Sequence, residues 1–279
     1  MLVNEFQIED LSDNLVQVMP GLWSVPGLNE DISYPEINHE IQKDFQENSF
    51  WYTHRSNCLK ELVRNFTSSA ILDIGGSNGQ LTKELGELTQ TVLMEPGEKG
   101  VKNALANGLS PVIYASLQDA KLKKDTLPAA GIFDVLEHIA DDLDFLKNIR
   151  NALKPDGRLY ISVPAYQFLW SEFDASVGHF RRYNKKTLTT LLNKAGYQVE
   201  FFSYMFYALP FPMWLFRKIF RKAKSSSHES TDLHKSKKSW TGKILQFLLM
   251  PELLIIKNGK SVPFGSSCIC VAKKLVQYE

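Results

Sequence analysis

Asp73, Glu95 and the glycine-rich turn between them are the residues of this chain best placed to do chemistry. An apolar run ends at residue 74, and the sequence then breaks into Gly75-Gly76-Ser77-Asn78-Gly79. A helix-like run follows, and a second apolar run closes on Glu95. Glycines let a ligand approach the backbone, and a carboxylate after the next strand can accept hydrogen bonds from both hydroxyls of a ribose. The unit therefore predicts a bound nucleoside.

The spacing of the glycines separates two classes of nucleoside cofactor. Dinucleotide-binding loops read G-x-G-x-x-G, and this chain has Ser77 where that pattern places its second glycine. The loop resembles instead the first motif of class I S-adenosylmethionine-dependent methyltransferases, D-x-G-x-G-x-G, with Asp73, Gly75 and Gly79 in place and Ser77 at the middle glycine. The resemblance implies that Asp73 orients the loop and the cofactor, and that Glu95 accepts the ribose hydroxyls.

A second block supports the same family. Residues 131–138 read G-I-F-D-V-L-E-H, and a K-P-D-G turn at 154–157 precedes a further apolar run. This order resembles the type 11 group of class I methyltransferases, in which the fourth strand runs into an L-E-H turn. The resemblance covers roughly residues 50–200 and the last strand. It implies that Phe133 and Asp134 lie at the sulfonium side of S-adenosylmethionine.

The resemblance implies further cofactor contacts. Leu117 and Gln118 would flank the adenine, although the acidic landmark of the third strand is shifted to Asp119. Arg55, in the run F-W-x-x-H-R, would meet the cofactor carboxylate. The alternative for that run is a plain helix with one core face and one surface face.

Two histidines, His138 and His179, are the candidate catalytic residues. A neutral imidazole at His138 could take the proton from an attacking hydroxyl, or it could only fix the turn by hydrogen bonding. With Asp134 and Glu137 it also forms a D-x-x-E-H run. That run resembles the E-x-x-E-H run of ubiquinone-biosynthesis O-methyltransferases, which use a divalent metal. Because Asp reaches less far than Glu, we count no metal among the expected cofactors.

The block from His179 to Tyr183 follows the predicted fifth strand, at the edge where a substrate would arrive. It resembles the H-x-R-R-Y sequence of the same methyltransferase group. Guanidinium groups form paired hydrogen bonds with carboxylate or phosphate, so Arg181, Arg182 and Tyr183 are the expected substrate residues. The alternative is a solvated loop that caps the next helix.

The elements that would position these residues alternate between strand and helix. Apolar runs predict strands at 71–74, 91–94, 111–114, 129–135, 158–163, 197–204 and 267–273, with amphipathic helices between most of them. With the family resemblance, this predicts an α/β fold: a doubly wound, mostly parallel, seven-stranded Rossmann-like sheet with an antiparallel last strand and a helical insertion before it. Such sheets bind ligands at the carboxyl ends of their strands.

Four segments are expected. Residues 1–66 would hold a loosely ordered arm and lid helices, 67–204 the cofactor-binding core, 205–262 an aromatic and basic insertion, and 263–279 the closing strand.

The insertion carries nine Lys or Arg residues against two acids between Arg217 and Lys243. Neither of its apolar runs reaches the ~20 uninterrupted apolar residues of a spanning helix. Three roles stay open for residues 205–262: contact with an anionic membrane surface, a lid over an apolar substrate, and an oligomer surface.

Composition limits the kinds of protein and the cellular locations that fit this chain. The chain has 279 residues, 44% hydrophobic and 23% charged, which is typical of a globular domain. A net charge of +1 gives no field that would attract nucleic acid. Three cysteines outside C-x-x-C spacing indicate a reducing compartment, and the first residues do not resemble a signal peptide. We expect a cytoplasmic protein and leave open peripheral contact with a membrane.

The sequence thus predicts an S-adenosylmethionine-dependent methyltransferase that transfers a methyl group to oxygen on a small-molecule, lipid-linked or sugar-linked acceptor. A nicotinamide-dependent oxidoreductase is the first alternative, and the glycine spacing opposes it. A non-catalytic protein that keeps the cofactor fold is the second, because no residue is an unambiguous base. Neither the acceptor nor the oligomeric state can be read from the chain.

Overall fold

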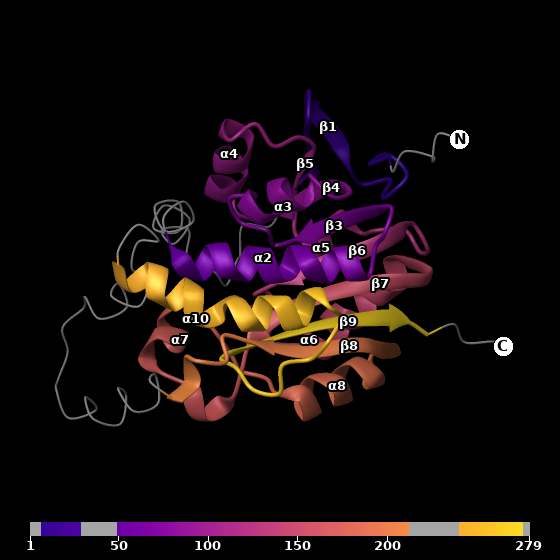
Figure 1. Cartoon of the computed structure of the whole chain (residues 1–279). Helices are drawn as coiled ribbons and strands as arrows, with labels where there is room; N and C mark the ends of the chain where they lie inside the picture. Colours follow the sequence, from indigo (N-terminus) through magenta and orange to yellow (C-terminus); the bar gives the residue numbers. More distant parts are fainter. Residues whose placement is uncertain (1–6, 29–48, 212–239, 276–279) are drawn as a thin grey trace.

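The computed structural model describes residues 7–28, 49–211 and 240–275 (Figure 1). Nine strands form one sheet in the order β1-β2-β5-β4-β3-β6-β7-β9-β8. In chain order they are β1 (Val16–Met19), β2 (Leu22–Ser24), β3 (Ala70–Ile74), β4 (Gln90–Glu95), β5 (Val112–Tyr114), β6 (Leu127–Phe133), β7 (Leu153–Pro164), β8 (Tyr197–Met205) and β9 (Ser267–Lys274).

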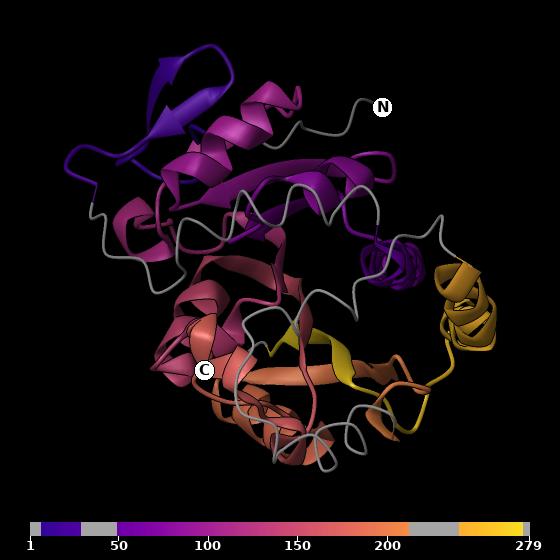
Figure 2. The same cartoon turned by 90° about the vertical axis from the view of Figure 1, so that its left-hand side faces the viewer.

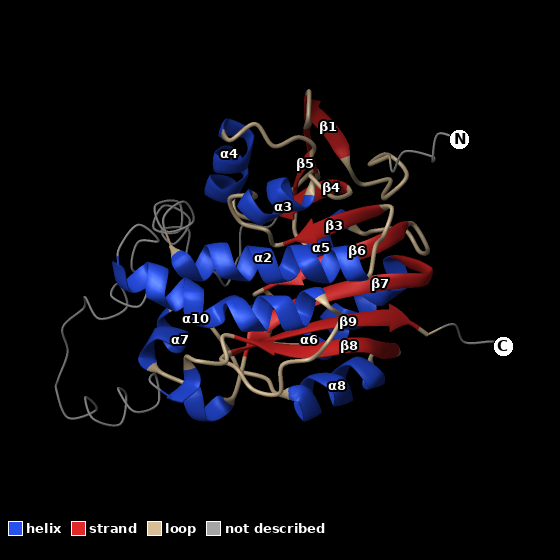
Figure 3. Ribbon diagram, viewed as in Figure 1, coloured by secondary structure: helices blue, strands red, loops and turns tan. Residues whose placement is uncertain are grey.

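The seven strands from β3 to β9 are those that the sequence predicts. β3 is parallel to β4 and β6, and β4 is parallel to β5. β9 runs antiparallel to both of its neighbours, β7 and β8 (Figure 3). The predicted fold class, mostly parallel with an antiparallel last strand, is confirmed. The chain order reverses on the two sides of β3, and open sheets of this kind bind their ligands at the carboxyl ends of the strands at such a point.

A hairpin at the edge of the sheet differs from the loosely ordered arm that the sequence suggests. β1 and β2 pair antiparallel, and β2 continues the sheet by pairing parallel with β5, with Leu22 opposite Val112. These strands are short and lie at an edge, and their residues are exposed or half-buried. Without a buried face they lack the period-two alternation that reveals a strand.

Helices cover both faces of the sheet (Figures 1 and 2). One face carries α2 (Phe50–Asn65), α3 (Gln80–Leu85), α4 (Glu98–Ala106) and α10 (Trp240–Lys257), and the other carries α5 (Leu117–Ala120), α6 (Asp142–Ala152) and α8 (Lys185–Lys194). Successive residues of β3 serve opposite sides: Ile71 packs with the α2 side and Leu72 with the α6 side. The short elements η1 (Leu136–His138), η2 (Gln167–Leu169) and α7 (Glu172–Ser176) follow β6 and β7.

Capping residues set the starts of the helices. Ser49 accepts a hydrogen bond from the N–H of Trp51 at the start of α2, and Asn184 caps α8 by accepting from Thr187. Of the lid helices predicted within residues 1–66, the structure describes α2 from residue 50, and residues 29–48 lie outside the described part of the chain. The predicted turn at 154–157 is part of β7, with φ of +63° at Asp156.

The insertion is described at residues 205–211 and 240–262, and its basic stretch between them lies outside the described residues. Within it, α10 packs beside α2 (Figure 1). None of the described helices combines the length and the apolar character needed to cross a membrane.

Candidate cofactor and active site

The glycine-rich loop leaves β3 in a backbone conformation that favours glycine. Gly75 and Gly79 have φ of +73° and +71°. A Cβ atom at Gly75 would lie 2.9 Å from Cγ2 of Val135, so no larger residue fits without a shift. Ser77 also has a positive φ, +54°, which costs free energy for a residue with a side chain. The backbone of the loop therefore passes close to Val135, in the residue pair that follows β6.

Asp73 lies buried beneath this loop. Its Oδ2 accepts a hydrogen bond from the hydroxyl of Thr82, 2.5 Å away. Burial raises the pKa of Asp73 to about 6. Its Oδ1 has no hydrogen-bond partner among the described residues. A buried acceptor in this state is suited to a donor that arrives with a ligand.

Glu95 ends β4 and ties the loop to that strand. Its Oε2 accepts from the N–H of Ser77 at 2.7 Å, and its Oε1 accepts from the N–H of Gly97 at 2.8 Å. Each carboxylate oxygen can accept a second hydrogen bond. Glu95 thus holds the loop at the carboxyl end of β4, the end of the sheet at which folds of this kind bind ligands.

Arg55, in the first half of α2, meets Asp134, which directly follows β6. Nε of Arg55 lies 2.6 Å from Oδ2 of Asp134, and the arginine is almost fully buried. Asp134 has φ of +60°, and its Oδ1 accepts from the hydroxyl of Ser162 at 3.2 Å. A strained non-glycine residue held by two partners is typical of a functional site. Phe133 precedes it as a buried residue of the α2 side.

The two residues predicted to flank an adenine begin α5. Leu117 is buried and Gln118 is exposed. The helix starts just after β5, whose last residue, Tyr114, lies opposite Glu95 in the sheet register. The pair therefore follows β5 at the end of the sheet at which β4 ends in Glu95.

His138 and His179 lie side by side, with ring centroids 4.6 Å apart and an interplanar angle of 77°. Burial lowers the pKa of His138 to about 4, with a smaller contribution from the neighbouring His179. At neutral pH the imidazole of His138 is therefore neutral and weakly basic.

Asp174 lies directly behind His179. Its Oδ1 is 2.9 Å from Nδ1 of His179 and 2.7 Å from Nε of Arg182. Burial alone would raise the pKa of Asp174, but hydrogen bonds from His179 and Arg182 hold it well below its usual value. A carboxylate accepts the hydrogen bond from Nδ1–H, so this contact orients the His179 ring with Nε2 on the opposite side.

Glu137 faces this pair from η1. Its Oε1 is 3.9 Å from Nε2 of His179, and burial, with a contribution from Asp134, raises the pKa of Glu137 well above its usual value. Glu137, His138 and His179 offer metal-ligating atoms that lie within 4.8 Å of one another. Asp134, which the sequence grouped with them, pairs with Arg55 instead. The set that could hold a metal thus takes His179 in place of Asp134.

The three predicted substrate residues make contacts within the protein. Nη1 of Arg181 is 2.5 Å, and the hydroxyl of Tyr183 2.9 Å, from Oδ2 of Asp142. Arg182 is buried against Asp174 with a side-chain exposure of 7%, whereas Arg181 is 32% exposed. Arg181 and Tyr183 therefore contact Asp142, and Arg182 contacts Asp174. Arg181 is the more accessible of the two arginines.

Asp174 is the residue of this cluster that the sequence analysis missed. The only local signal is an acid five positions before His179, preceded by Ser171, with which it forms a capping box at α7. Its contacts with His179 and Arg182 arise from a turn of the chain that no periodicity reveals.

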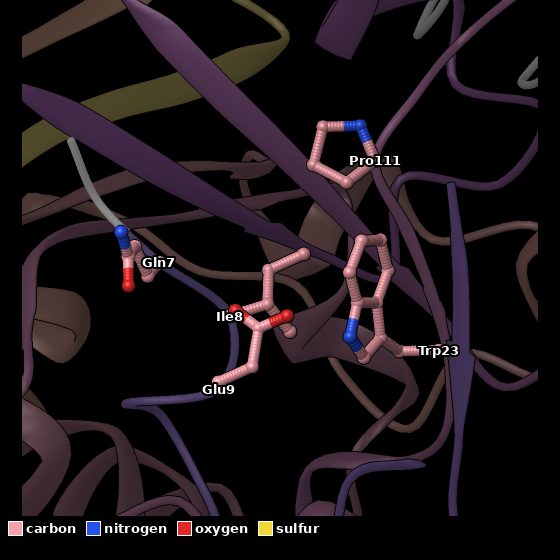
Figure 4. Close-up of a pocket in the computed structure, with 5 residues that line it drawn as sticks. All are labelled: Gln7, Ile8, Glu9, Trp23 and Pro111. Carbon is pink, nitrogen blue, oxygen red and sulfur yellow. The ribbon is translucent and has the colours of Figure 1, made fainter. Parts of the chain in front are cut away.

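A surface hollow of about 400 Å³ lies elsewhere (Figure 4). It is lined by Gln7, Ile8, Glu9, Trp23 and Pro111. Pro111 precedes β5, so the hollow lies at the amino end of a parallel strand. Ligands of such sheets bind at the carboxyl ends, and we do not assign this hollow to the cofactor.

Comparison with known families accounts for the loop and its acids. Residues 40–200, more than half of the chain, match the model of a family described as methyltransferase domain. The chain belongs to this methyltransferase family. Its methyl donor is S-adenosylmethionine, as the sequence predicts, and the nicotinamide alternative is not supported.

Curated relatives cover part of this methyltransferase. Over 123 residues it is 32% identical to the mitochondrial ubiquinone biosynthesis O-methyltransferase of Bos taurus, a match of 39% of this chain and 33% of the relative. Over 155 residues it is 29% identical to the corresponding protein of Schizosaccharomyces pombe, covering 48% and 56%. The chain thus matches about a third to a half of the length of these relatives.

Solved structures show the same fold. A Thermotoga maritima S-adenosylmethionine-dependent methyltransferase has a TM-score of 0.53 at 17% identity, covering 86% of this chain and 98% of that one. Phosphoethanolamine N-methyltransferase 2 of Haemonchus contortus, in complex with S-adenosylmethionine, has a TM-score of 0.50 at 18% identity, covering 78% and 52%.

The residues of the methyltransferase fit this cofactor. Oδ1 of Asp73 lacks a partner among the described residues, Glu95 can accept further hydrogen bonds, and Gly75 leaves no room for a side chain. Together they supply a buried acceptor, a second carboxylate beside the loop and close backbone access.

Proposed function

We propose that this methyltransferase transfers a methyl group to an oxygen atom of a small-molecule, lipid-linked or sugar-linked acceptor, and that His179 takes up the acceptor's proton. The observation that carries the proposal is the 2.9 Å contact between Nδ1 of His179 and Oδ1 of buried Asp174. A carboxylate behind an imidazole fixes its tautomer and orientation, as a general base requires. A hydroxyl benefits from such a base because it must lose its proton as it attacks.

The partial match to ubiquinone biosynthesis O-methyltransferases supports oxygen as the accepting atom, within the region that the chains share. The name applies to those proteins. For this chain it adds weight to the proposal without identifying the acceptor.

The cofactor site in this proposal surrounds the glycine loop. S-adenosylmethionine supplies an electrophilic methyl group on its sulfonium when bound. The residues that we assign to holding it are Asp73, Gly75 and Gly79 at the loop, Glu95 at the ribose, Leu117 and Gln118 at the adenine, and Phe133, Asp134 and Arg55 at the methionine end. Much of the rate enhancement then comes from holding donor and acceptor in line.

His138 supports the neighbouring ring in this scheme. With a pKa of about 4 it is too weakly basic to compete for a proton at neutral pH. It packs edge-on against His179 and limits the orientations that the His179 ring can adopt. A catalytic role for His138 would instead require it to act as a hydrogen-bonding group.

The acceptor would approach from the block that contains Arg181, Arg182 and Tyr183. Arg181, as the accessible cation, would bind an acidic or phosphorylated part of the acceptor. Arg182 and Tyr183 would act through Asp174 and Asp142. Residues 67–204 with 263–279 would form the catalytic core.

A methyl-transfer screen tests the proposal. The full chain is incubated with S-adenosylmethionine labelled at the methyl carbon and with fractions of a cell lysate. We expect label in an O-methyl product, either an ether that resists mild base or an ester that releases methanol. With His179→Gln the label should fall at least a hundredfold while the Kd for S-adenosylmethionine stays within about threefold. Label found only in an amine would overturn oxygen as the acceptor.

A chelation experiment distinguishes a proton-accepting role of His179 from a metal-ligating role. If EDTA abolishes transfer and Mg²⁺ restores it, the cluster of Glu137, His138 and His179 holds a cation, and His179 is a ligand rather than the base. Transfer that is insensitive to EDTA supports the proton-accepting role.

A further inference from the structure

Helix α10 has one face in the core and one apolar face in solvent. Its buried side consists of Leu249, Glu252 and Ile256. Its exposed side carries Ile244, Phe247, Leu248, Met250, Leu254 and Ile255. Phe247 is 76% exposed. Large apolar side chains occur singly on most surfaces, but a contiguous group of six along one helix marks an interaction site.

A buried polar clamp fixes which face of α10 points outward. Oε1 of Glu252 accepts from the N–H of Phe206 at 2.6 Å and lies 2.6 Å from Nε2 of His54 on α2. Oε2 accepts from the N–H of Tyr207 at 2.8 Å. Rotation of the helix would leave these buried groups without partners, at a cost of several kcal/mol. The outward apolar face is therefore a stable feature of the fold.

The clamp is also one of the sets that could ligate a metal, since Cys58 lies 3.4 Å from Nε2 of His54. Burial, with a contribution from Glu252, raises the pKa of the Cys58 thiol well above its usual value. Both oxygens of Glu252 already accept hydrogen bonds. This set is accounted for as structural.

Charge on α10 selects the partner of the apolar face. Lys243 and Lys257 are exposed at the two ends of the helix, and Lys260 follows. The only acid between residues 240 and 260 is Glu252, which is fully buried. The exposed surface thus combines an apolar centre with cationic ends. Anionic lipid complements this arrangement, because apolar groups enter the acyl boundary while lysines stay at the phosphates.

We propose that α10 docks the protein on the surface of an anionic bilayer. The helix of 18 residues would lie in the interface plane, since it does not have the character of a spanning helix. This inference is independent of the methyl-transfer proposal: binding to vesicles can be lost with the cofactor site intact, and the reverse.

Vesicle flotation of the full chain tests the docking surface. The probes are vesicles of phosphatidylcholine alone and with 30% phosphatidylglycerol. We expect the wild type to float with the anionic vesicles, and Phe247→Glu with Leu254→Glu to lower the partition coefficient at least tenfold. The matched control is Val16→Glu with Val18→Glu, which adds the same charge to exposed valines of β1 and should leave flotation unchanged.

A second variant tests the proposal even if the first one disturbs folding. Lys243→Gln with Lys257→Gln should lower binding to anionic vesicles about fivefold per lysine and leave the unfolding midpoint unchanged. Equal flotation of wild type and both variants overturns the proposal. So does a wild-type dimer in sedimentation that Phe247→Glu with Leu254→Glu converts to monomer without any vesicle binding, because the face would then belong to a second copy.

Discussion

Arg55 and Asp134 form a salt bridge of 2.6 Å that joins helix α2 to the end of strand β6. The arginine guanidinium also lies over the ring of Trp51, 5.7 Å from its centroid. The pair fixes Asp134 at a positive φ at the point where the parallel strands end. A helix that precedes the core strands β3 to β9 in sequence is thereby tied to the carboxyl end of β6.

Loss of this pair should weaken cofactor binding. Arg55→Met removes a buried cation and leaves the carboxylate of Asp134 without its partner, so we expect the Kd for S-adenosylmethionine to rise about 10- to 100-fold. The control is Lys60→Met on the same helix, whose contact with Glu84 is 3.8 Å long and partly exposed. Isothermal titration calorimetry measures both. Equal affinities for the two variants would remove Arg55 from the cofactor site.

Ser77→Gly and Gly79→Ala, both in the glycine-rich loop, should affect the stability of the protein differently. Ser77→Gly removes the cost of a positive φ, about 1–2 kcal/mol, against a loss of about 0.5–1 kcal/mol from the flexibility of glycine. The free energy of unfolding should therefore stay equal or rise by up to about 1.5 kcal/mol. Gly79→Ala should lower it, because its Cβ would lie 2.5 Å from Cδ2 of Leu109. Urea denaturation distinguishes them, and a destabilised Ser77→Gly would contradict the account of the loop.

Removing Glu252 should destabilise the protein strongly. Glu252→Ala leaves His54 and the N–H groups of Phe206 and Tyr207 unpaired in the core, at an expected cost of about 3–5 kcal/mol. Glu200→Ala is the control: it breaks a partly exposed pair with Arg158, worth about 0–1 kcal/mol. Chemical denaturation compares the two. Similar losses would mean that the clamp does not hold α10.

Protonation of His138 should make stability depend on pH. Its pKa of about 4 in the folded protein lies below the ordinary 6.5, so the unfolded chain binds more protons between these values. Stability is then lost as pH falls through this window, by about 2–3 kcal/mol between pH 7 and pH 4.5. His138→Asn removes this contribution. As pH falls, the wild type should therefore lose more unfolding free energy than His138→Asn does. A difference between the two proteins that stays constant with pH would contradict the burial of His138.

The features that the sequence predicts are local ones. Asp73, Gly75 and Gly79 stand in one motif, Glu95 ends the next apolar run, and both follow from the strand–loop–helix pattern. The seven core strands and their mostly parallel arrangement follow from the alternation of strands and helices, and the antiparallel last strand follows from the family resemblance. These inferences need no knowledge of distant contacts.

The features that the sequence did not predict depend on distant contacts or on edges. Asp174 gains its role only because His179 and Arg182 turn back onto it. The pairing of Arg55 with Asp134 joins residues 79 positions apart, so no local pattern reveals it, and the contact of Arg55 with the cofactor carboxylate stays a prediction. β1 and β2 have no buried face, so their residues carry no alternation.

The central claim is that the loop after β3 and the acid after β4 bind S-adenosylmethionine, and calorimetry with Glu95→Gln tests it most directly. The control is Glu98→Gln, which changes an exposed acid on α4 by the same atoms. We expect the wild type and Glu98→Gln to bind with equal Kd, and Glu95→Gln to bind about 10- to 100-fold more weakly because charged hydrogen bonds to the ribose are lost. Unchanged affinity in Glu95→Gln, with the fold intact by circular dichroism, would contradict the assignment of this site.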